Sequence, residues 1–522
     1  MGTISAISTL ADISSYWAES TPNKTAIIAG AREWTFAEVD REAAQVAAGL
    51  IEEGVGTGDR VAFLDKNVPE YFPILFGGAK LNAVSVAVNW RLAPAEMEFI
   101  VNNAEVKVLF VGEEFLPSLA LMTITPIPTI VIIGSPGSSG YLAYDEWIDA
   151  AQPAPIETVV ESDDTCYQLY TSGTTGLPKG VELTNRNLIT CMKIGGKNWS
   201  FHEGAVNLVA MPLFHIAGSG WGLAGMYSGA QTVLTREVDP VEIIKLIPEL
   251  GITHALLVPA VLQFLLAVPS AADADLSSME VMVYGASPIS ERVLVGSMEL
   301  FGCKFIQAYG LTETTGGVAQ LDSQDHDPSG GRSNLLRSAG RPWGDVELKI
   351  VDATTLDEVA DGEVGEIWVR SIQVMKGYWR DPEATAAAVT DDGFFRTGDA
   401  GYLKEGYLFI HDRVKDMIVS GGENIYPAEI ENALMKHPAV ADVAVIGVPH
   451  EIWGETVKAI VVRAEEALDQ QTLGQFAKQH LAGYKCPTSV DWVEELPRNP
   501  SGKILKTELR APYWEGRDRL VN

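Results

Sequence analysis

The chain has 522 residues, of which 47% are hydrophobic and 20% are charged, so it can bury large cores and is not a disordered protein. It carries 38 Lys and Arg against 69 Asp and Glu, and the formal net charge of −31 opposes binding to nucleic acid or to an anionic membrane. At about 100–200 residues per domain, this length predicts two to four domains.

Short apolar runs alternate with amphipathic segments through the first 300 residues. The apolar runs are predicted to be buried strands, at 60–64, 106–111, 129–133, 206–211, 254–258 and 281–284. Helices are predicted between several of them, at 35–53, 241–250 and 290–301. Strands that alternate with helices are typical of an α/β architecture with largely parallel sheets.

The pattern changes from about residue 340, where strands are predicted close together without helices, at 346–351, 366–370 and 407–411. This spacing indicates a small antiparallel or barrel-like unit. After Asp412 a compact α+β module is predicted, with helices at 427–437 and 470–481 and strands at 440–448, at 457–462 and near Val490. A short polar link, residues 411–416, separates the two patterns.

We therefore predict a multidomain α/β protein. Residues 1–412 form a large domain of layered α/β sheets with a small barrel-like subdomain, and residues 413–522 form a small, mobile α+β domain.

A run rich in glycine and hydroxyl residues, Tyr-Thr-Ser-Gly-Thr-Thr-Gly-Leu-Pro-Lys-Gly-Val, spans residues 170–181. It follows a predicted strand at 165–169 and precedes a helix that is predicted to start near residue 184. Its glycines allow tight turns with bare backbone amides, its hydroxyls add donors, and Lys179 adds a positive charge. Because Lys179 is followed by Gly180 and not by Ser or Thr, this is not the Walker pattern. We interpret the run as a polyphosphate-binding loop.

Seven further motifs follow the same order as in one large superfamily: MPLFH at 211–215, YGASP at 284–288, YGLTE at 309–313, FRTGD at 395–399, DRVKD at 412–416, GGEN at 421–424 and PSGK at 500–503. With these motifs the chain resembles, from about residue 15 to 510, the adenylate-forming superfamily of acyl- and aryl-CoA synthetases, firefly-type luciferases and peptide-synthetase adenylation domains. The resemblance implies two half-reactions. A carboxylate and ATP give an acyl-adenylate and pyrophosphate, and a thiol, usually that of CoA, then displaces AMP.

The resemblance also implies which residues bind ATP and AMP. Tyr309 and the segment from Gly285 lie on the two faces of adenine, and Asp399, joined by Arg413, binds the ribose. The full predicted set is Thr171, Ser172, Gly173, Thr174, Thr175, Gly176, Lys179, Gly285, Ala286, Ser287, Tyr309, Gly310, Thr312, Asp399 and Arg413.

Catalytic roles are implied for Lys503, His215, Thr312 and Glu313. Lys503 reaches the carboxylate and the α-phosphate during adenylation, and its charge can stabilise the transition state. His215 gates the acyl pocket, and Thr312 contacts phosphate. Glu313 is the predicted Mg²⁺ ligand, since a carboxylate suits a hard ion that bridges phosphate oxygens.

One lysine on a mobile domain cannot serve both half-reactions if CoA enters from the same side. The resemblance implies that the small domain rotates about a hinge at Lys415 and brings in a CoA-binding loop with Gly421, Gly422 and Asn424. ATP, CoA and Mg²⁺ are therefore the predicted cofactors. A carboxylic acid is the predicted small-molecule partner, and whether the chain forms a homodimer stays open.

The acid is predicted from the residues around the gate. The stretch after His215, IAGSGWGLAG, is rich in small residues, and Gly310 follows Tyr309 with no tryptophan of the kind that shortens the pocket of acetate-type enzymes. We expect an apolar pocket built from the segment after His215, from Tyr309 and from residues 339–340, and a medium- or long-chain fatty acid as substrate. An aryl acid such as cinnamate or benzoate is the alternative. Coumarate ligases use a tyrosine two residues after the gate histidine, where this chain has Ala217.

The motifs leave three other functions to consider. A peptide-synthetase adenylation domain would need an aspartate near residues 212–216, where none stands, and a carrier domain for which the sequence leaves no room. Luciferase-like oxidation stays open. A non-catalytic nucleotide-binding homologue would not need to keep Glu313, Asp399 and Lys503 together.

A cytoplasmic location is expected from the same sequence. The four cysteines lie far apart with no Cys-x-x-Cys pair, which favours neither a disulfide framework nor a zinc site. The N-terminus has no basic region followed by an apolar core. The most apolar long stretch, residues 252–269, is interrupted by polar residues and proline, so no membrane span is predicted.

Overall fold

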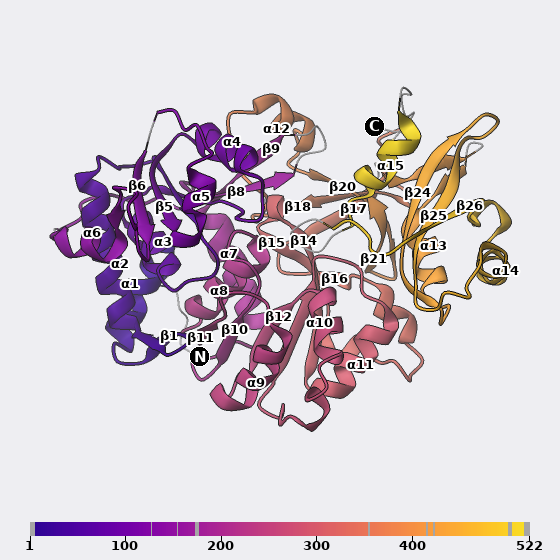
Figure 1. The fold of residues 1–522 in the computed structure, drawn as a ribbon, viewed down its shortest axis with the longest axis horizontal. Coiled ribbons are helices and arrows are strands. Elements are labelled where there is room, and N and C mark those ends of the chain that lie inside the picture. The colour runs from indigo at the N-terminus through magenta and orange to yellow at the C-terminus, as the bar shows by residue number, and fades with distance from the viewer. Residues whose placement is uncertain are drawn as a thin grey trace.

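The computed structural model describes residues 6–126, 128–153, 155–172, 177–352, 355–413, 416–420, 423–498 and 504–515. Its strands form four sheets, and the two large sheets contain every described strand before residue 343 together with β19 (Gly377–Tyr378). Figure 1 shows these two sheets with their helices, and the C-terminal sheet with α13, α14 and α15 at the opposite end of the molecule.

The first large sheet has nine strands. In spatial order they are β16 (Arg341–Pro342), β15 (Gly316–Leu321), β14 (Lys304–Leu311), β13 (Val281–Gly285), β12 (His254–Leu257), β10 (Val206–Val209), β11 (Gln231–Leu234), β1 (Thr25–Ala29) and β2 (Arg32–Thr35). The strands from β14 to β1 are parallel, and antiparallel strands extend both edges. The carboxyl ends of β10, β13 and β14 therefore meet at one edge, which is where ligands collect in α/β proteins.

The second large sheet has eight strands. Their order is β19 (Gly377–Tyr378), β9 (Pro178–Thr184), β8 (Thr165–Ser172), β4 (Val84–Ala87), β3 (Arg60–Leu64), β5 (Val106–Gly112), β6 (Thr129–Ile133) and β7 (Leu142–Ala143). The strands from β8 to β7 are parallel, whereas β9 runs antiparallel to β8 and to β19.

Helices fill the space between the two large sheets and cover their outer faces. The shared core joins α2 and α3 with α8, as the burial of Val39, Phe72 and Trp221 in one cluster indicates. The helices of this region are α1 (Leu10–Ser20), α2 (Phe36–Glu52), α3 (Tyr71–Lys80), α4 (Pro94–Ala104), α5 (Leu116–Leu119), α6 (Tyr144–Ala150), α7 (Asn185–Asn198), α8 (Ile216–Tyr227), α9 (Pro240–Leu250), α10 (Pro259–Leu266) and α11 (Glu291–Phe301). Helices α9 to α11 pack in a separate core on the first sheet, and α4 and α5 in another on the second.

The predicted α/β architecture with largely parallel sheets is confirmed, and so is the change of pattern near residue 340. There a four-stranded antiparallel sheet follows, in the order β17 (Glu347–Val351), β18 (Gly365–Arg370), β20 (Phe395–Lys404) and β21 (Tyr407–Arg413), with α12 (Pro382–Ala388) beside it. Strand β20, which carries Asp399, was not among the predicted strands.

The last sheet contains only strands that follow residue 416. They are β23 (Glu423–Ile425), β22 (Ile418–Ser420), β25 (Gly454–Arg463), β24 (Val440–His450) and β26 (Ser489–Val493). Its helices are α13 (Pro427–Leu434), α14 (Gln470–His480) and α15 (Lys506–Trp514). This α+β module has its own hydrophobic cores. Within the described residues, no helix combines the length and the apolar character that crossing a bilayer requires.

Candidate functional site

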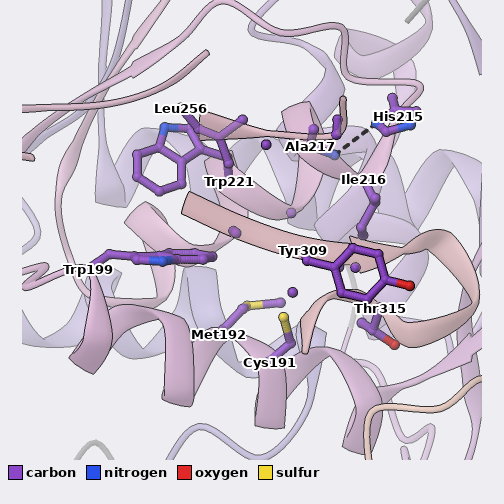
Figure 2. Close-up of a pocket in the computed structure, with 18 of the residues that line it drawn as sticks. Cys191, Met192, Trp199, His215, Ile216, Ala217, Trp221, Leu256, Tyr309 and Thr315 are labelled. Atoms are coloured by element: carbon purple, nitrogen blue, oxygen red, sulfur yellow. Dashed lines mark hydrogen bonds between the residues drawn. The ribbon is translucent and has the colours of Figure 1, made fainter. Parts of the chain in front are cut away.

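An apolar pocket opens at the carboxyl edge of the first sheet, where the predicted site motifs converge. Its walls come from α7 and α8 and from the ends of β13 and β14, and its empty space, counted with the open mouth, is about 750 Å³. Figure 2 shows His215, Tyr309 and Thr315 on one side of the pocket, and Trp199, Trp221 and Leu256 on the other. Along α8 the residues Ala217, Gly220 and Ala224 face it at helical spacing. Small side chains on one helix face leave a channel along that helix.

His215 stands between β10 and α8 and caps the helix. Its Nδ1 accepts a hydrogen bond from the backbone N–H of Ala217 at 3.1 Å (Figure 2). Burial lowers the pKa of His215 from 6.5 to about 4, because the low-polarity pocket disfavours the charged ring. The imidazole is therefore neutral at physiological pH. With Nδ1 accepting, its proton is on Nε2, so His215 can donate a hydrogen bond from that atom.

Tyr309 and Asp399 come together from two different sheets. The Tyr309 hydroxyl donates a hydrogen bond to Oδ2 of Asp399 at 2.7 Å, and both side chains are buried. Asp399 on β20 is also the strand partner of Arg413 at the end of β21, which brings the backbones of these two predicted ribose residues side by side. The structure does not describe the Arg413 side chain.

Gly285 and Ala286 form the wall of the pocket beside Tyr309. A Cβ on Gly285 would overlap the carbonyl oxygen of Ala308, so only glycine fits between β13 and β14 here. Ala286 adopts a φ of +66°, a conformation that costs free energy in a residue with a side chain and that is enriched at functional sites. Ser287 follows them but does not line the pocket.

The glycine-rich run lies in a β-hairpin, which corrects the prediction that it connects a strand to a helix. The last residues of the run begin strand β9, in which Val181 and Leu183 are buried, and α7 begins only after this strand, at Asn185. Thr171 and Lys179 face each other across the hairpin.

Lys179 also lies near Tyr378 on the neighbouring strand β19, with its Nζ 5.0 Å from the centre of the Tyr378 ring. Gly173, Thr174, Thr175 and Gly176 are outside the described residues, and of Ser172 only the backbone, at the end of β8, is described.

Glu313 lies next to two hydroxyl groups of the second sheet. Its Oε1 accepts hydrogen bonds from Tyr378 at 3.1 Å and from Thr171 at 3.5 Å, and Thr312 is buried beside it. Within the described residues no group of three or more His, Cys, Asp or Glu could hold a metal. One carboxylate with neighbouring hydroxyls nevertheless fits Mg²⁺, because this ion is usually held by one or two carboxylates together with substrate phosphates and water.

Most of the predicted residues of the C-terminal module cannot be placed. Lys503, the hinge residue Lys415, Gly421 and Gly422 are outside the described residues. Asn424 lies on β23, where it pairs with Val419, and its side chain is not described.

One expectation about the acyl pocket was wrong. Residues 339–340 do not line it, since they pack against Leu408 of β21. Trp199 and Trp221 close the far end of the pocket, and Gly310 beside Tyr309 carries no plug. A side chain on Gly310 could not act as one, because its Cβ would overlap the carbonyl of Gly316.

Sequence reasoning missed the part of the pocket that comes from α7. Leu188, Cys191 and Met192 line the wall, and Trp199 follows at the end of the helix. Burial raises the pKa of the Cys191 thiol to about 12, so it is an inert apolar group. The apolar spacing of i, i+3 and i+4 could have identified this helix face, but it does not reveal whether the face meets a cavity or a core.

Comparisons with known proteins agree with this geometry. A family model described as AMP-binding enzyme matches residues 15–379, and one described as AMP-binding enzyme C-terminal domain matches residues 429–503. The fatty acid–acyl-carrier-protein ligase ScoC of Streptomyces coeruleorubidus is 39% identical over 99% of this chain and 98% of its own length. Feruloyl-CoA synthase of an Amycolatopsis species is 37% identical over 95% and 97%. The structure of ATP-bound MatB from Rhodopseudomonas palustris is similar with a TM-score of 0.88 and 29% identity, over 96% of this chain and 99% of that one.

Proposed function

The chain belongs to the AMP-binding enzyme family, and from this membership we propose that it is an AMP-forming ligase that joins a medium-chain fatty acid to the thiol of CoA. The family match confirms the resemblance predicted from the motifs, and its acyl- and aryl-CoA ligases use ATP, CoA and Mg²⁺. The apolar pocket that starts at His215 and Tyr309 carries the proposal. Such a pocket suits an apolar acid whose carboxylate stays at the mouth, beside the candidate nucleotide residues.

In the first half-reaction, a carboxylate oxygen attacks the α-phosphorus of ATP. The new bond is the acyl-adenylate P–O bond, the α–β phosphoanhydride bond breaks, and pyrophosphate leaves. We propose that Tyr309 and the Gly285–Ala286 segment hold adenine, and that Asp399 with Arg413 holds the ribose. The pairing of Tyr309 with Asp399 supports this assignment, because the hydrogen bond orients the Asp399 carboxylate before ATP binds.

The phosphates would lie against the hairpin of Thr171 and Lys179, next to Thr312 and Glu313. Glu313 would hold Mg²⁺, which neutralises charge on the phosphate oxygens when it is bound. His215 is neutral and can donate from Nε2 toward the substrate carboxylate. Lys503 would add the positive charge that stabilises the transition state of adenylation.

In the second half-reaction, the thiol attacks the carbonyl carbon of the acyl-adenylate, the thioester forms, and AMP leaves with the electron pair of the broken bond. We propose that residues 413–522 form a separate domain that turns about Lys415 between the two steps and presents Gly421, Gly422 and Asn424 to the thiol. The separate sheet after residue 416 supports this division. Since ScoC is named as a ligase for acyl-carrier protein, a carrier-bound thiol must be tested beside CoA.

The length of the pocket favours a medium chain over a long one. From Ala217 to Ala224 the face of α8 covers seven steps along the helix, which at a rise of about 1.5 Å each gives roughly 10 Å. An extended alkyl chain advances about 1.3 Å per methylene, given carbon–carbon bonds of about 1.5 Å, so about eight methylenes fit. An aryl acid is the second candidate, because the rings of Trp199 and Trp221 at the far end could pack on an aromatic substrate.

The test is pyrophosphate release over a panel from acetate to palmitate with benzoate, cinnamate and ferulate, each with CoA, with acyl-carrier protein and without a thiol. We expect efficiency to rise to about eight to ten carbons and then fall, and Ala217→Phe to shorten the optimum, because overpacking an apolar slot is costly. A preference for cinnamate or ferulate over every aliphatic acid would replace the fatty-acid proposal by the aryl one. Nucleotide binding without any turnover would favour a non-catalytic homologue.

A further inference from the structure

Trp199 forms the far end of the acyl pocket. It follows the last residue of α7, its side chain is 6% exposed, and it lies opposite the mouth that His215 and Tyr309 form (Figure 2). Its ring centre lies 5.2 Å from that of Trp221 and 5.5 Å from that of Trp343. Trp199 and Trp221 therefore close this end of the pocket, and Trp343 packs against Trp199 without lining the cavity. The chain of a bound acid would meet the indole of Trp199 there.

The three indoles are held in different ways. Trp221 donates its N–H to the carbonyl of Leu208 at 3.0 Å, and Trp343 donates to Oε1 of Gln373 at 3.0 Å. The buried Nε1 of Trp199 has no acceptor within the described part of the chain. Two rings are therefore fixed by hydrogen bonds, whereas packing alone holds the indole of Trp199. Of the three, Trp199 can be replaced without leaving a buried acceptor unpaired.

The position of the Trp199 ring depends on a glycine one turn earlier in α7. A Cβ on Gly195 would lie 2.6 Å from Cζ3 of Trp199, far closer than an ordinary contact of 3.4–4 Å. The ring therefore rests on bare helix backbone. The backbone carbonyl of Trp199 is fixed separately, by a hydrogen bond with Nε2 of His254 at 3.1 Å. Gly195 thus sets how far the indole lies from the pocket mouth.

We propose that Trp199 is the residue that limits the length of the acyl chain, and that Gly195 sets where this limit falls. The inference rests on the proposed function, because it takes the pocket to be the acyl site. A bicyclic ring built of bonds of about 1.5 Å is roughly 5 Å long, so its removal makes room for about three or four methylenes. A methyl group on Gly195 pushes the ring by about 1 Å to restore ordinary contact, which removes room for about one methylene.

The experiment uses the full chain and compares Trp199→Ala, Trp199→Leu and Gly195→Ala with wild type. Fatty acids from hexanoate to palmitate are tested one at a time, without ATP, for the rise in Tm that each causes, since a ligand that binds the folded state raises Tm with its affinity. Acid-dependent pyrophosphate release is measured on the same proteins. Trp199→Leu keeps an apolar side chain of intermediate size, so this variant tests the proposal if Trp199→Ala does not fold.

A second tryptophan and glycine pair supplies the matched control. Trp147 on α6 is also 6% exposed, and a Cβ on Gly49 of α2 would lie 2.5 Å from its Cζ2. Its ring packs on Phe110 at 5.3 Å, away from the pocket lining. Trp147→Ala and Gly49→Ala disturb the core in the same way. They therefore separate a loss of protein stability from a change in the length of fatty acid that binds best.

We expect the acid that binds best to lengthen by about three or four carbons in Trp199→Ala and by fewer in Trp199→Leu. It should shorten by about one carbon in Gly195→Ala and stay unchanged in both controls. In Trp199→Ala, palmitate should gain at least tenfold in affinity relative to octanoate. A wild-type binding profile in both Trp199 variants would overturn the proposal. If the profiles shift as expected but no acid releases pyrophosphate, the length limit stands and the proposed function falls.

Discussion

The hydrogen bond between Tyr309 and Asp399 allows a test of whether these residues bind ATP, because one substitution removes a single oxygen atom from the pair. Tyr309→Phe keeps the ring, and hence any stacking on adenine, but removes the hydroxyl that donates to Asp399 at 2.7 Å. Both side chains are buried, at 9% and 7% exposure, so water replaces the lost donor poorly. A hydrogen bond to a charged group contributes about 1.5–3 kcal/mol. At about 1.4 kcal/mol per factor of ten, KM for ATP should rise roughly 10- to 100-fold.

The assay is steady-state pyrophosphate release with ATP and the fatty acid varied in turn. We expect KM for ATP to rise, while kcat at saturating ATP and KM for the acid stay within about threefold. The reason is that the Tyr309 hydroxyl orients the Asp399 carboxylate, which is proposed to bind the ribose, and does not touch the reacting atoms. Asp399→Asn should raise KM for ATP as well. The double variant should cost less than the sum of the two changes, since Asp399→Asn weakens the same hydrogen bond that Tyr309→Phe removes.

Tyr407→Phe is the control, because Tyr407 donates to Oδ2 of Asp325 at 3.0 Å in a second buried tyrosine and carboxylate pair outside the pocket. It should lower stability by a similar amount and leave KM for ATP unchanged. The assignment of Asp399 to the ribose would be refuted if Tyr309→Phe and Tyr407→Phe had the same KM for ATP as wild type, or if the KM for the acid alone changed.

Three further predictions concern the chemistry. Lys503→Ala should slow acyl-adenylate formation by about 10²–10⁴-fold and leave thiol transfer from a supplied acyl-adenylate nearly intact, as separate assays of the half-reactions can measure; equal loss in both would remove Lys503 from its role. Glu313→Gln should raise the Mg²⁺ concentration needed for half-maximal adenylation more than it weakens nucleotide binding, and full activity at limiting Mg²⁺ would exclude Glu313 as the ligand. The pKa of His215, lowered to about 4, keeps the ring neutral down to about pH 5, so His215 should add no acid limb near pH 6.5 to the adenylation rate. Between pH 6.5 and 4 the unfolded chain binds a proton that the folded chain does not. Wild type should therefore lose stability relative to His215→Asn, which keeps a capping oxygen, as pH falls through that window in urea titrations.

The sequence predicted the sheets well, because buried parallel strands are uniformly apolar. The runs at 60–64 and 281–284 became β3 and β13 almost residue for residue. The segment 178–184 was missed because Pro178, Lys179 and Gly180 resemble a loop, and only Val181 and Leu183 show the alternation of a strand. Pairing with β8 and β19 makes it a strand, and such pairing is not visible in local composition.

The site was predicted less completely than the fold, since a motif identifies residues but not the space between them. The motifs located Tyr309, Asp399 and Glu313, and the structure adds their hydrogen-bond partners, of which Tyr378 carries no motif signal. The far end of the pocket depends on where α7 packs against α8, so Trp199 could not be assigned from local sequence. That Gly310 leaves no room for a side chain could not be predicted either, because the close approach of its backbone to Gly316 is a three-dimensional property.

The proposed function requires this chain to activate a carboxylic acid as an acyl-adenylate in the pocket at the edge of the first sheet. Exchange of radiolabelled pyrophosphate into ATP tests it most directly, because the exchange requires the reversible first half-reaction and no thiol. We predict exchange that depends on a medium-chain fatty acid and on Mg²⁺ and that proceeds without CoA. Cleavage of ATP to ADP, or no acid-dependent exchange with any aliphatic or aryl acid, would contradict the claim.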